Sequence, residues 1–208
     1  MLQNNTAINI LVTLIVIFIS TAVHEMMHAW VAYKLGDDMA YLHGRISLNP
    51  IRHIDPFLTV LLPLGMMLLG MPPILAAKPV PININRVAGR EMGLALIAVA
   101  GPLTNLVLAI ISAGILRFTP LSGFALYFAT RFFFMNVGLF VFNMLPIPPL
   151  DGSRLLYAFA PEPLQNIMEQ IESFGVMGVI VIVTLFASFI GPVLLNIENG
   201  LVRILLGY

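Results

Sequence analysis

The most constraining feature of the sequence is an uncharged apolar run that continues directly into a pair of histidines. Residues 8–23 contain no ionisable side chain, and the next seven residues are HEMMHAW. A helix needs about 20 apolar residues to cross the hydrocarbon of a bilayer. The run and the motif therefore predict one spanning helix over residues 7–35, with His24 and His28 in its C-terminal third. Any site built on these histidines is expected at membrane depth.

The spacing of the two histidines predicts a metal site. Residues four apart lie on one face of a helix, so the imidazoles of His24 and His28 can bind one ion. Glu25 follows the first histidine and is positioned to act as general base on water at that ion. Because ionisable groups are costly inside an apolar span, metal binding is favoured over a purely structural role for the pair.

The composition assigns the whole chain to the membrane. Of 208 residues, 59% are hydrophobic and only 10% are charged, against about 25% charged in soluble domains. The 10 basic and 10 acidic residues cancel, so the charge indicates no nucleic-acid partner. The N-terminus lacks the basic region and cleavage site of a signal peptide, so the first helix should be retained. These observations predict an all-α polytopic membrane protein.

The pattern of apolar runs predicts a single domain, 1–208, with a core of about 7–155 and a C-terminal part, 156–208, of an interfacial segment and a helix. About four spanning helices are expected, at residues 7–35, 93–118, 124–145 and 174–195. Segment 57–77 is broken by Pro and Gly and is expected to be re-entrant. The alternating piece at residues 45–48 indicates a short strand, and residues 78–84 read as an extended segment interrupted by prolines.

Two histidines leave a catalytic zinc one protein ligand short. The chain contains no cysteine, so the missing ligand must be a histidine or a carboxylate, and two nitrogens with one oxygen make zinc the expected metal, one ion per chain. Asp151 is the best candidate, because it closes the proline-rich stretch NMLPIPPLDG and Gly152 permits close approach of the backbone. The alternative role for Asp151 is that of a turn residue before glycine.

Placing Asp151 beside His24 requires an odd number of crossings between the helices that precede the two residues. Helix 93–118 supplies one, and the re-entrant segment supplies none. Seven basic residues then share one face of the membrane and three share the other. The positive-inside rule then predicts a multi-pass protein of the cell membrane, with its N-terminus outside and its metal site within the membrane, nearer the cytoplasmic side. The seven are Lys34, Arg45, Arg52, Lys78, Arg86, Arg90 and Arg154.

The order of HEMMH, GPLTN (101–105) and NMLPIPPLDG (143–152) resembles the site-2 protease family of intramembrane zinc metalloproteases, in its compact form without a PDZ domain. The resemblance implies zinc on His24, His28 and Asp151, Glu25 as base, and contacts of Asn105 and Asn143 with the substrate backbone or the oxyanion. It also implies that the pieces at 41–48 and 78–84 form a small membrane-associated β-structure, which pairs with unwound substrate. For Asn105 and Asn143, the alternative is hydrogen bonding between packed helices, which is the favoured role for Asn136.

The leading hypothesis is an endopeptidase that cuts single-span membrane proteins or signal-peptide remnants and works within the lipid bilayer. The rival hypothesis is a zinc-binding membrane scaffold or a metal transporter that uses the same ligands without turnover. A transporter should carry ionisable residues through both leaflets, whereas here they cluster at one depth. Oligomeric state and physiological substrate are left open.

Overall fold

The computed structural model describes residues 6–55, 61 and 78–207, and all regular elements in these ranges are helical. Four helices are long and apolar enough to cross a membrane: α1 (Thr6–Lys34), α4 (Arg90–Phe118), α5 (Gly123–Asn143) and residues Ser188–Leu206 of α8 (Gly175–Leu206). The chain is therefore a multi-pass membrane protein, as its composition predicts.

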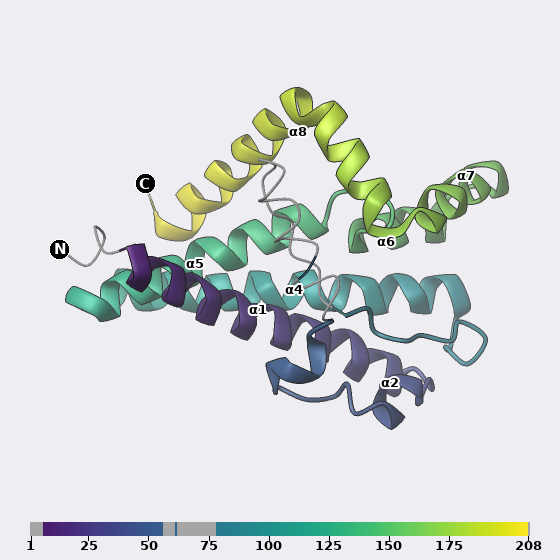
Figure 1. Cartoon of the computed structure of the whole chain (residues 1–208), viewed down its shortest axis with the longest axis horizontal. Coiled ribbons are helices and arrows are strands. Elements are labelled where there is room, and N and C mark those ends of the chain that lie inside the picture. The colour runs from purple at the N-terminus through teal and green to yellow at the C-terminus, as the bar shows by residue number, and fades with distance from the viewer. Residues whose placement is uncertain (1–5, 56–60, 62–77, 208) are drawn as a thin grey trace.

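Helix α4 lies at the centre of the bundle and contacts α1, α5 and α8 (Figure 1). Half of its most apolar window is buried, against 22% of that of α1 and 28% of that of α5. Its buried face consists mainly of small residues, which allow neighbouring helices to approach closely in a membrane; they include Gly93, Ala95, Ala98, Gly101, Ala109 and Ala113. This close packing brings the polar side chains of α1 and α4 together.

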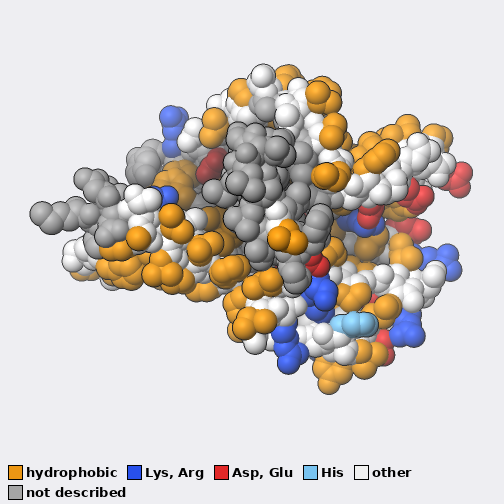
Figure 2. Space-filling view, in the orientation of Figure 1, with side chains coloured by type: hydrophobic (Ala, Val, Ile, Leu, Met, Phe, Trp, Pro, Cys, Tyr) orange, Lys and Arg blue, Asp and Glu red, His pale blue; other side chains and the backbone are white. Residues whose placement is uncertain are grey.

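The outward faces of the spanning helices are apolar. On α1, Leu11 and Ile15 are 59% and 40% exposed, and on α8, Leu185 and Phe189 are each 74% exposed. Exposed side chains of this kind cover much of the surface in Figure 2. Lipid is the solvent that such faces require.

Two short helices connect α5 to α8. They are α6 (Asp151–Phe159) and α7 (Glu162–Ser173), separated by the Ala160–Pro161 break. The carboxylate of Glu172 on α7 pairs with Arg154 on α6, and Tyr157 donates to Glu169 over 2.6 Å. Both helices are strongly amphipathic, as expected for the segment that the sequence places at the interface.

The last helix is longer than predicted. Helix α8 continues to Leu206, eleven residues past the expected end at 195, although Pro192 lies inside it. A proline removes one backbone hydrogen bond but leaves the later ones intact. The helix ends at Gly207, whose positive φ of 79° suits a C-terminal cap.

The predicted β-structure is not formed by the described residues. Residues 39–42 form a short helix, α2 (Met39–Leu42), the 3₁₀-helix η2 (Pro50–His53) follows it, and residues 45–48 and 78–83 are irregular. Because Pro79 and Pro81 have no amide hydrogen, one edge of segment 78–84 cannot form a ladder. The amide of Lys78 instead donates to the carbonyl of His53 over 2.9 Å.

The prediction of a re-entrant hairpin at 57–77 falls on residues that lie outside the described ranges, apart from Leu61. The residues that flank this segment, His53 and Lys78, are joined by the hydrogen bond above. The described residues on the two sides of the segment therefore meet at one place beside α1, which η2 contacts.

Candidate metal centre

Helix α1 presents His24 and His28 to the interior of the bundle from successive turns. Each residue is only 6% exposed, and the two Nε2 atoms are 3.0 Å apart. The spacing of four residues on one helix is what brings the rings together, as the sequence predicts. The pair faces α4, whose Ile97 and Asn105 contact the histidine rings.

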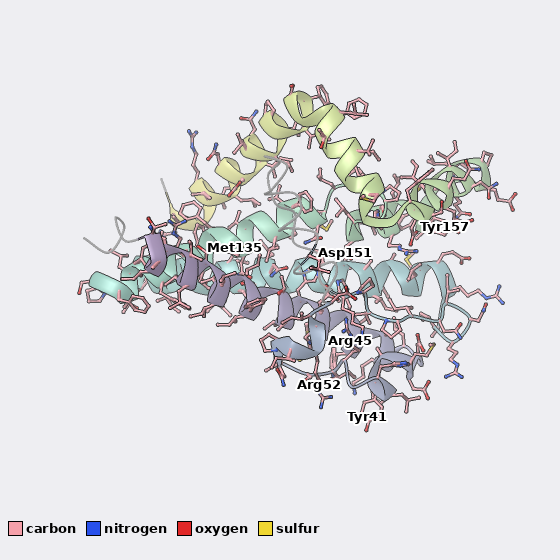
Figure 3. The ribbon with its side chains drawn as sticks, viewed as in Figure 1. Tyr41, Arg45, Arg52, Met135, Asp151 and Tyr157 are labelled. Carbon is pink, nitrogen blue, oxygen red and sulfur yellow. The ribbon has the colours of Figure 1, made fainter. Side chains whose placement is uncertain are left out.

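Asp151 completes a group of three candidate metal ligands. As the first residue of α6, it places Oδ2 3.1 Å from Nε2 of His24 and 3.3 Å from Nε2 of His28. The three ligand atoms lie within 4.8 Å of one another, although 127 residues separate His24 from Asp151. Figure 3 shows Asp151 beside α4, in the middle of the molecule.

The hydrogen bonds of the two imidazoles determine which ring nitrogens face Asp151. Nδ1 of His24 lies 2.6 Å from Oδ1 of Asn105, and Nδ1 of His28 lies 2.7 Å from the carbonyl oxygen of Ile97. Both oxygens are acceptors, so each neutral ring carries its proton on Nδ1 and directs an Nε2 lone pair toward Asp151. Two lone pairs and a carboxylate that converge in a buried site can bind a cation. The donor set, two imidazoles and one carboxylate, fits zinc.

Two glycines make room for this arrangement. A Cβ atom on Gly101 of α4 would lie 2.3 Å from Nε2 of His28 and 2.6 Å from Nε2 of His24. A Cβ on Gly152 would lie 2.3 Å from the carbonyl oxygen of Met144 at the end of α5. Gly152 thus permits the close approach that the sequence predicts, and Gly101 keeps the space beside the ligand atoms free.

A buried polar chain supports His24 from behind. The amide of Asn105 donates to Oδ1 of Asn136 over 2.9 Å, and the amide of Asn136 donates to the hydroxyl of Ser20 over 3.0 Å. All three residues are fully buried. Outer partners of this type hold a ligating histidine in one tautomer and one orientation.

The two predicted substrate contacts, Asn105 and Asn143, lie in different surroundings. Asn105 is buried and engaged with His24 and Asn136, so its geometry suits positioning of the ligand, and its contact with substrate stays a prediction. Asn143 is partly buried and donates to the carbonyl of Leu139 on its own helix. The sequence favoured a packing role for Asn136, and the structure shows that role. The sequence analysis gave Ser20 no role. Ser20 lies four residues before His24, on the same face of α1, and this spacing could have indicated that it supports the histidine.

Glu25 is partly exposed at the level of the histidines. One basic group that its charge affects is Arg45. Burial lowers the pKa of the Arg45 guanidinium, and the negative charge of Glu25 partly offsets this shift. Arg45 is only 3% exposed and donates to the carbonyl of Arg52 over 2.5 Å and to the carbonyl of Lys78. Sequence reasoning assigned Arg45 only to the cytoplasmic face.

Comparison with known proteins gives the same family as the motifs. The model of "Peptidase family M50" matches residues 120–187. A Bacillus subtilis protein named "Putative zinc metalloprotease YwhC" is 38% identical over 190 residues, which cover 87% of this chain and 82% of that protein.

More distant relatives carry similar names. "Putative zinc metalloprotease Rip2" of Mycolicibacterium smegmatis is 29% identical over 168 residues, 78% of this chain and 62% of that protein. "Putative zinc metalloprotease MJ0611" of Methanocaldococcus jannaschii is 50% identical over 62 residues, 29% of this chain and 31% of that protein. No solved structure matches the chain. On the similarity to YwhC over most of both proteins, the chain belongs to peptidase family M50, the site-2 protease family that its motifs resemble.

Proposed function

We propose that this protein is an intramembrane zinc endopeptidase that hydrolyses peptide bonds within or near the spanning segments of other membrane proteins. The observation that carries the proposal is the convergence of His24, His28 and Asp151 on one point inside a bundle of apolar helices. Membership of a peptidase family and the names of the relatives support hydrolysis as the reaction.

The residues around the site have distinct roles in this proposal. A zinc ion held by the three ligands would act as a Lewis acid toward the scissile carbonyl and would acidify water. His24 and His28 offer Nε2 because Asn105 and Ile97 hold Nδ1. Glu25 takes a proton from water and returns it to the leaving amine. Asn143, at the end of α5, remains the proposed contact for the substrate backbone.

The substrate must expose its backbone before it can be cut. A spanning helix hides its carbonyls in its own hydrogen bonds, and lipid cannot satisfy them once they are freed. In an extended segment, alternate residues direct their amides to the same edge. Pro79 and Pro81 block one edge of segment 78–84, whereas Val80 and Ile82 keep amides on the other. We propose that an unwound substrate pairs with this second edge, by addition of a strand.

The distribution of basic residues supports one orientation. The seven residues that the sequence assigns to one face belong to elements around the end of α1 and the start of α4. On the face in Figure 2, most Lys and Arg side chains lie over that end. The positive-inside rule makes this end cytoplasmic, which places the N-terminus outside and the metal centre nearer the cytoplasm. The hydrogen bond between His53 and Lys78 supports a hairpin between them, because it returns the chain to the side it left.

The decisive experiment replaces the proposed base. Glu25→Gln keeps the size of the side chain and leaves the three metal ligands unchanged. We expect the purified variant to bind one zinc ion per chain, as the wild type does, and to lose cleavage of a single-span substrate reconstituted in the same liposomes. Cleavage at the wild-type rate would remove Glu25 from the mechanism. A wild type that binds zinc but cuts no membrane substrate would favour a scaffold or a transporter.

A further inference from the structure

The last spanning stretch, Ser188–Leu206 of α8, is the least covered part of the bundle. Only 6% of its most apolar window is buried, against 50% for α4, 28% for α5 and 22% for α1. Its inner face packs on α4 and α5 through Leu194, Leu201 and Leu205. Figure 1 shows the stretch at the edge of the bundle, so its outer face is open to the surroundings.

The outer face of this stretch carries a row of polar side chains. Asn196, Asn199 and Arg203 are exposed, as are Phe189 and Pro192 before them. The intervals between these five residues are three, four, three and four, which place all of them on one face of a helix. This face, the outer stripe of α8, lies opposite the leucines that pack on the bundle.

The two asparagines of the outer stripe lie at membrane depth. The inner face of the same stretch packs against Ala109 of α4 and Phe133 of α5. Ala109 is nine residues from the end of α4, and Phe133 is ten residues from the start of α5, which correspond to about 14 and 15 Å of helix. Half of the hydrocarbon is about 15 Å thick. Asn196 and Asn199 therefore lie inside the hydrocarbon, whereas Arg203 is nearer its edge.

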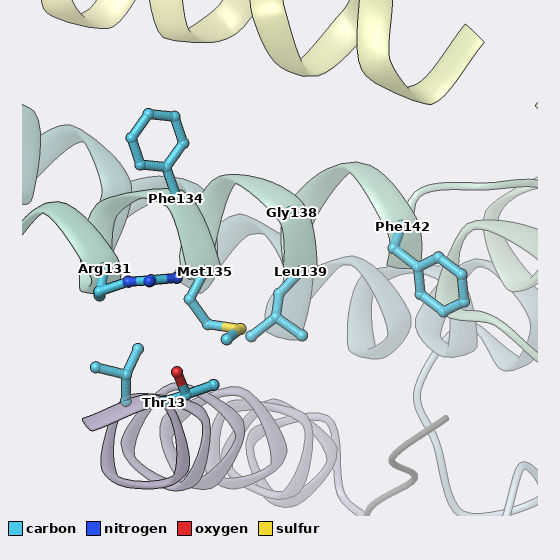
Figure 4. A pocket seen from close by; sticks show the side chains of 8 residues that line it. Thr13, Arg131, Phe134, Met135, Gly138, Leu139 and Phe142 are labelled. Atoms are coloured by element: carbon cyan, nitrogen blue, oxygen red, sulfur yellow. The ribbon is translucent and has the colours of Figure 1, made fainter. Parts of the chain in front are cut away.

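Within the described part of the chain, the outer stripe has no polar partner. None of the hydrogen bonds or ion pairs formed there involves the side chain of Asn196, Asn199 or Arg203. Arg131 of α5 lines a groove beside α1, and Figure 4 shows it on the side of α5 turned toward α1, with α8 on the other side. Polar groups that face acyl chains are costly, and in membranes they pair between helices. The stripe therefore fits another helix better than lipid.

We propose that the outer stripe is the interface of a symmetric dimer, in which α8 of a second copy packs against it around a two-fold axis along the membrane normal. Two copies inserted in the same orientation hold each residue at one depth, so around this axis each residue faces its own counterpart. An asparagine amide both donates and accepts, so Asn196 and Asn199 each form a reciprocal pair with themselves.

The other members of the stripe agree with this partner. Intervals of three and four keep two parallel helices in contact over several turns, and a buried asparagine in such a seam fixes the pairing of two strands. Arg203, nearer the edge, extends toward the headgroups, so the two arginines need not meet. An unrelated helix would need matching amides at both depths. The dimer is independent of the proposed function, since no candidate metal ligand lies on α8.

Single cysteines report this contact directly, because the natural chain has none. Asn196→Cys and Asn199→Cys each leave the other asparagine in place. In membranes oxidised with copper phenanthroline, both full-length variants should form disulfide-linked dimers. Ile197→Cys and Ile204→Cys are the matched controls, because these residues are 47% and 75% exposed on a different side of α8 and should stay monomeric.

Two results of this experiment would overturn the dimer. One is the absence of a disulfide at positions 196 and 199, or equal cross-linking at all four positions, which would indicate random collision. The other is a disulfide to a different protein, identified by mass spectrometry, which would assign the outer stripe to another membrane partner.

Asn199→Leu tests the hydrogen-bonded pair without a cross-linker. A reciprocal pair contains two hydrogen bonds between helices, so its loss should raise the dissociation constant of the dimer about tenfold. Energy transfer between donor-labelled and acceptor-labelled chains in liposomes, measured over a range of protein-to-lipid ratios, gives this constant. Ile197→Leu is the control, and zinc bound by each variant confirms that it is folded. An unchanged constant when both asparagines are replaced by leucine would contradict the proposal.

Discussion

Gly101 and Asn105 occupy successive turns of α4 and serve the two histidines in different ways. Gly101 leaves the space beside both Nε2 atoms free, and Asn105 accepts the proton of His24 Nδ1. Neither residue is a metal ligand. The motif GPLTN therefore contributes a cavity and an orienting partner to the metal centre, and each contribution can be removed by a single substitution.

Gly101→Ala should abolish zinc binding and cleavage. The added methyl group would lie 2.3 Å from Nε2 of His28, so the ring or α4 must move away. Gly114→Ala, on the same helix with open space around it, should keep both activities and stabilise the helix by up to about 1 kcal/mol. Zinc content after gel filtration, measured by mass spectrometry, distinguishes the two variants. Zinc retained by Gly101→Ala would show that the ligands do not converge as the structure has them.

Asn105→Ala should weaken zinc binding about 10–100-fold, the usual effect of losing an outer partner of a ligating histidine. Asn105→Asp keeps an oxygen acceptor for Nδ1 and should restore most of the affinity. Competition with a fluorescent chelator measures both constants. Asn199→Ala, at an exposed position of α8, is the control. If Asn105→Ala retains wild-type zinc affinity but loses cleavage, Asn105 would contact the substrate, as the sequence predicts, and would not be needed to position His24.

At the scale of elements, one arginine organises the loops beside the metal centre. Arg45 binds the carbonyls of Arg52 and Lys78, the residues on either side of the apolar segment 57–77. The side chain of Arg52 in turn donates to the carbonyl of Gly44 over 3.0 Å. Side-chain donors thus replace the strand ladder that the sequence predicts for this region, because the prolines of segment 78–84 remove backbone donors.

Arg45→Met should lower the free energy of unfolding by about 1–3 kcal/mol, the cost of leaving hydrogen-bonding groups unsatisfied. Arg52→Met removes a single bond from a more exposed side chain and should cost less. Thermal unfolding in detergent compares the two variants. Equal stability of Arg45→Met and the wild type would show that the loops do not depend on this guanidinium.

At the scale of the whole molecule, the metal centre joins the first and the third spanning helices of the described bundle. Helix α1 ends shortly after His28, and Asp151 follows the end of α5, so both ends must lie on one side of the membrane. Helix α4 carries the chain back across the membrane between α1 and α5. The crossing parity argued from the sequence agrees with this arrangement.

The orientation can be tested directly, because the natural chain has no cysteine. Asn85→Cys and Ser122→Cys introduce single thiols at exposed positions before α4 and between α4 and α5. A membrane-impermeant maleimide should label Cys at position 122 in intact cells and Cys at position 85 only after permeabilisation. The reverse pattern would place the metal centre on the outer side.

The sequence by itself determined that the chain crosses a membrane several times, and it singled out three candidate metal ligands. Charged groups are costly in lipid, so the few ionisable residues near apolar runs stand out, and a proline-rich turn with Asp-Gly is recognisable without a structure. The family comparison and the clustering of His24, His28 and Asp151 agree with that reading.

Only the tertiary structure decided which residues serve the ligands from outside. The pairing of Asn105 with His24, the space at Gly101 and the two carbonyls on Arg45 depend on how α4 and the loops are rotated and how deep they lie. Hydropathy is insensitive to both quantities, because lipid favours every apolar face equally and helices in membranes associate through packing and hydrogen bonds.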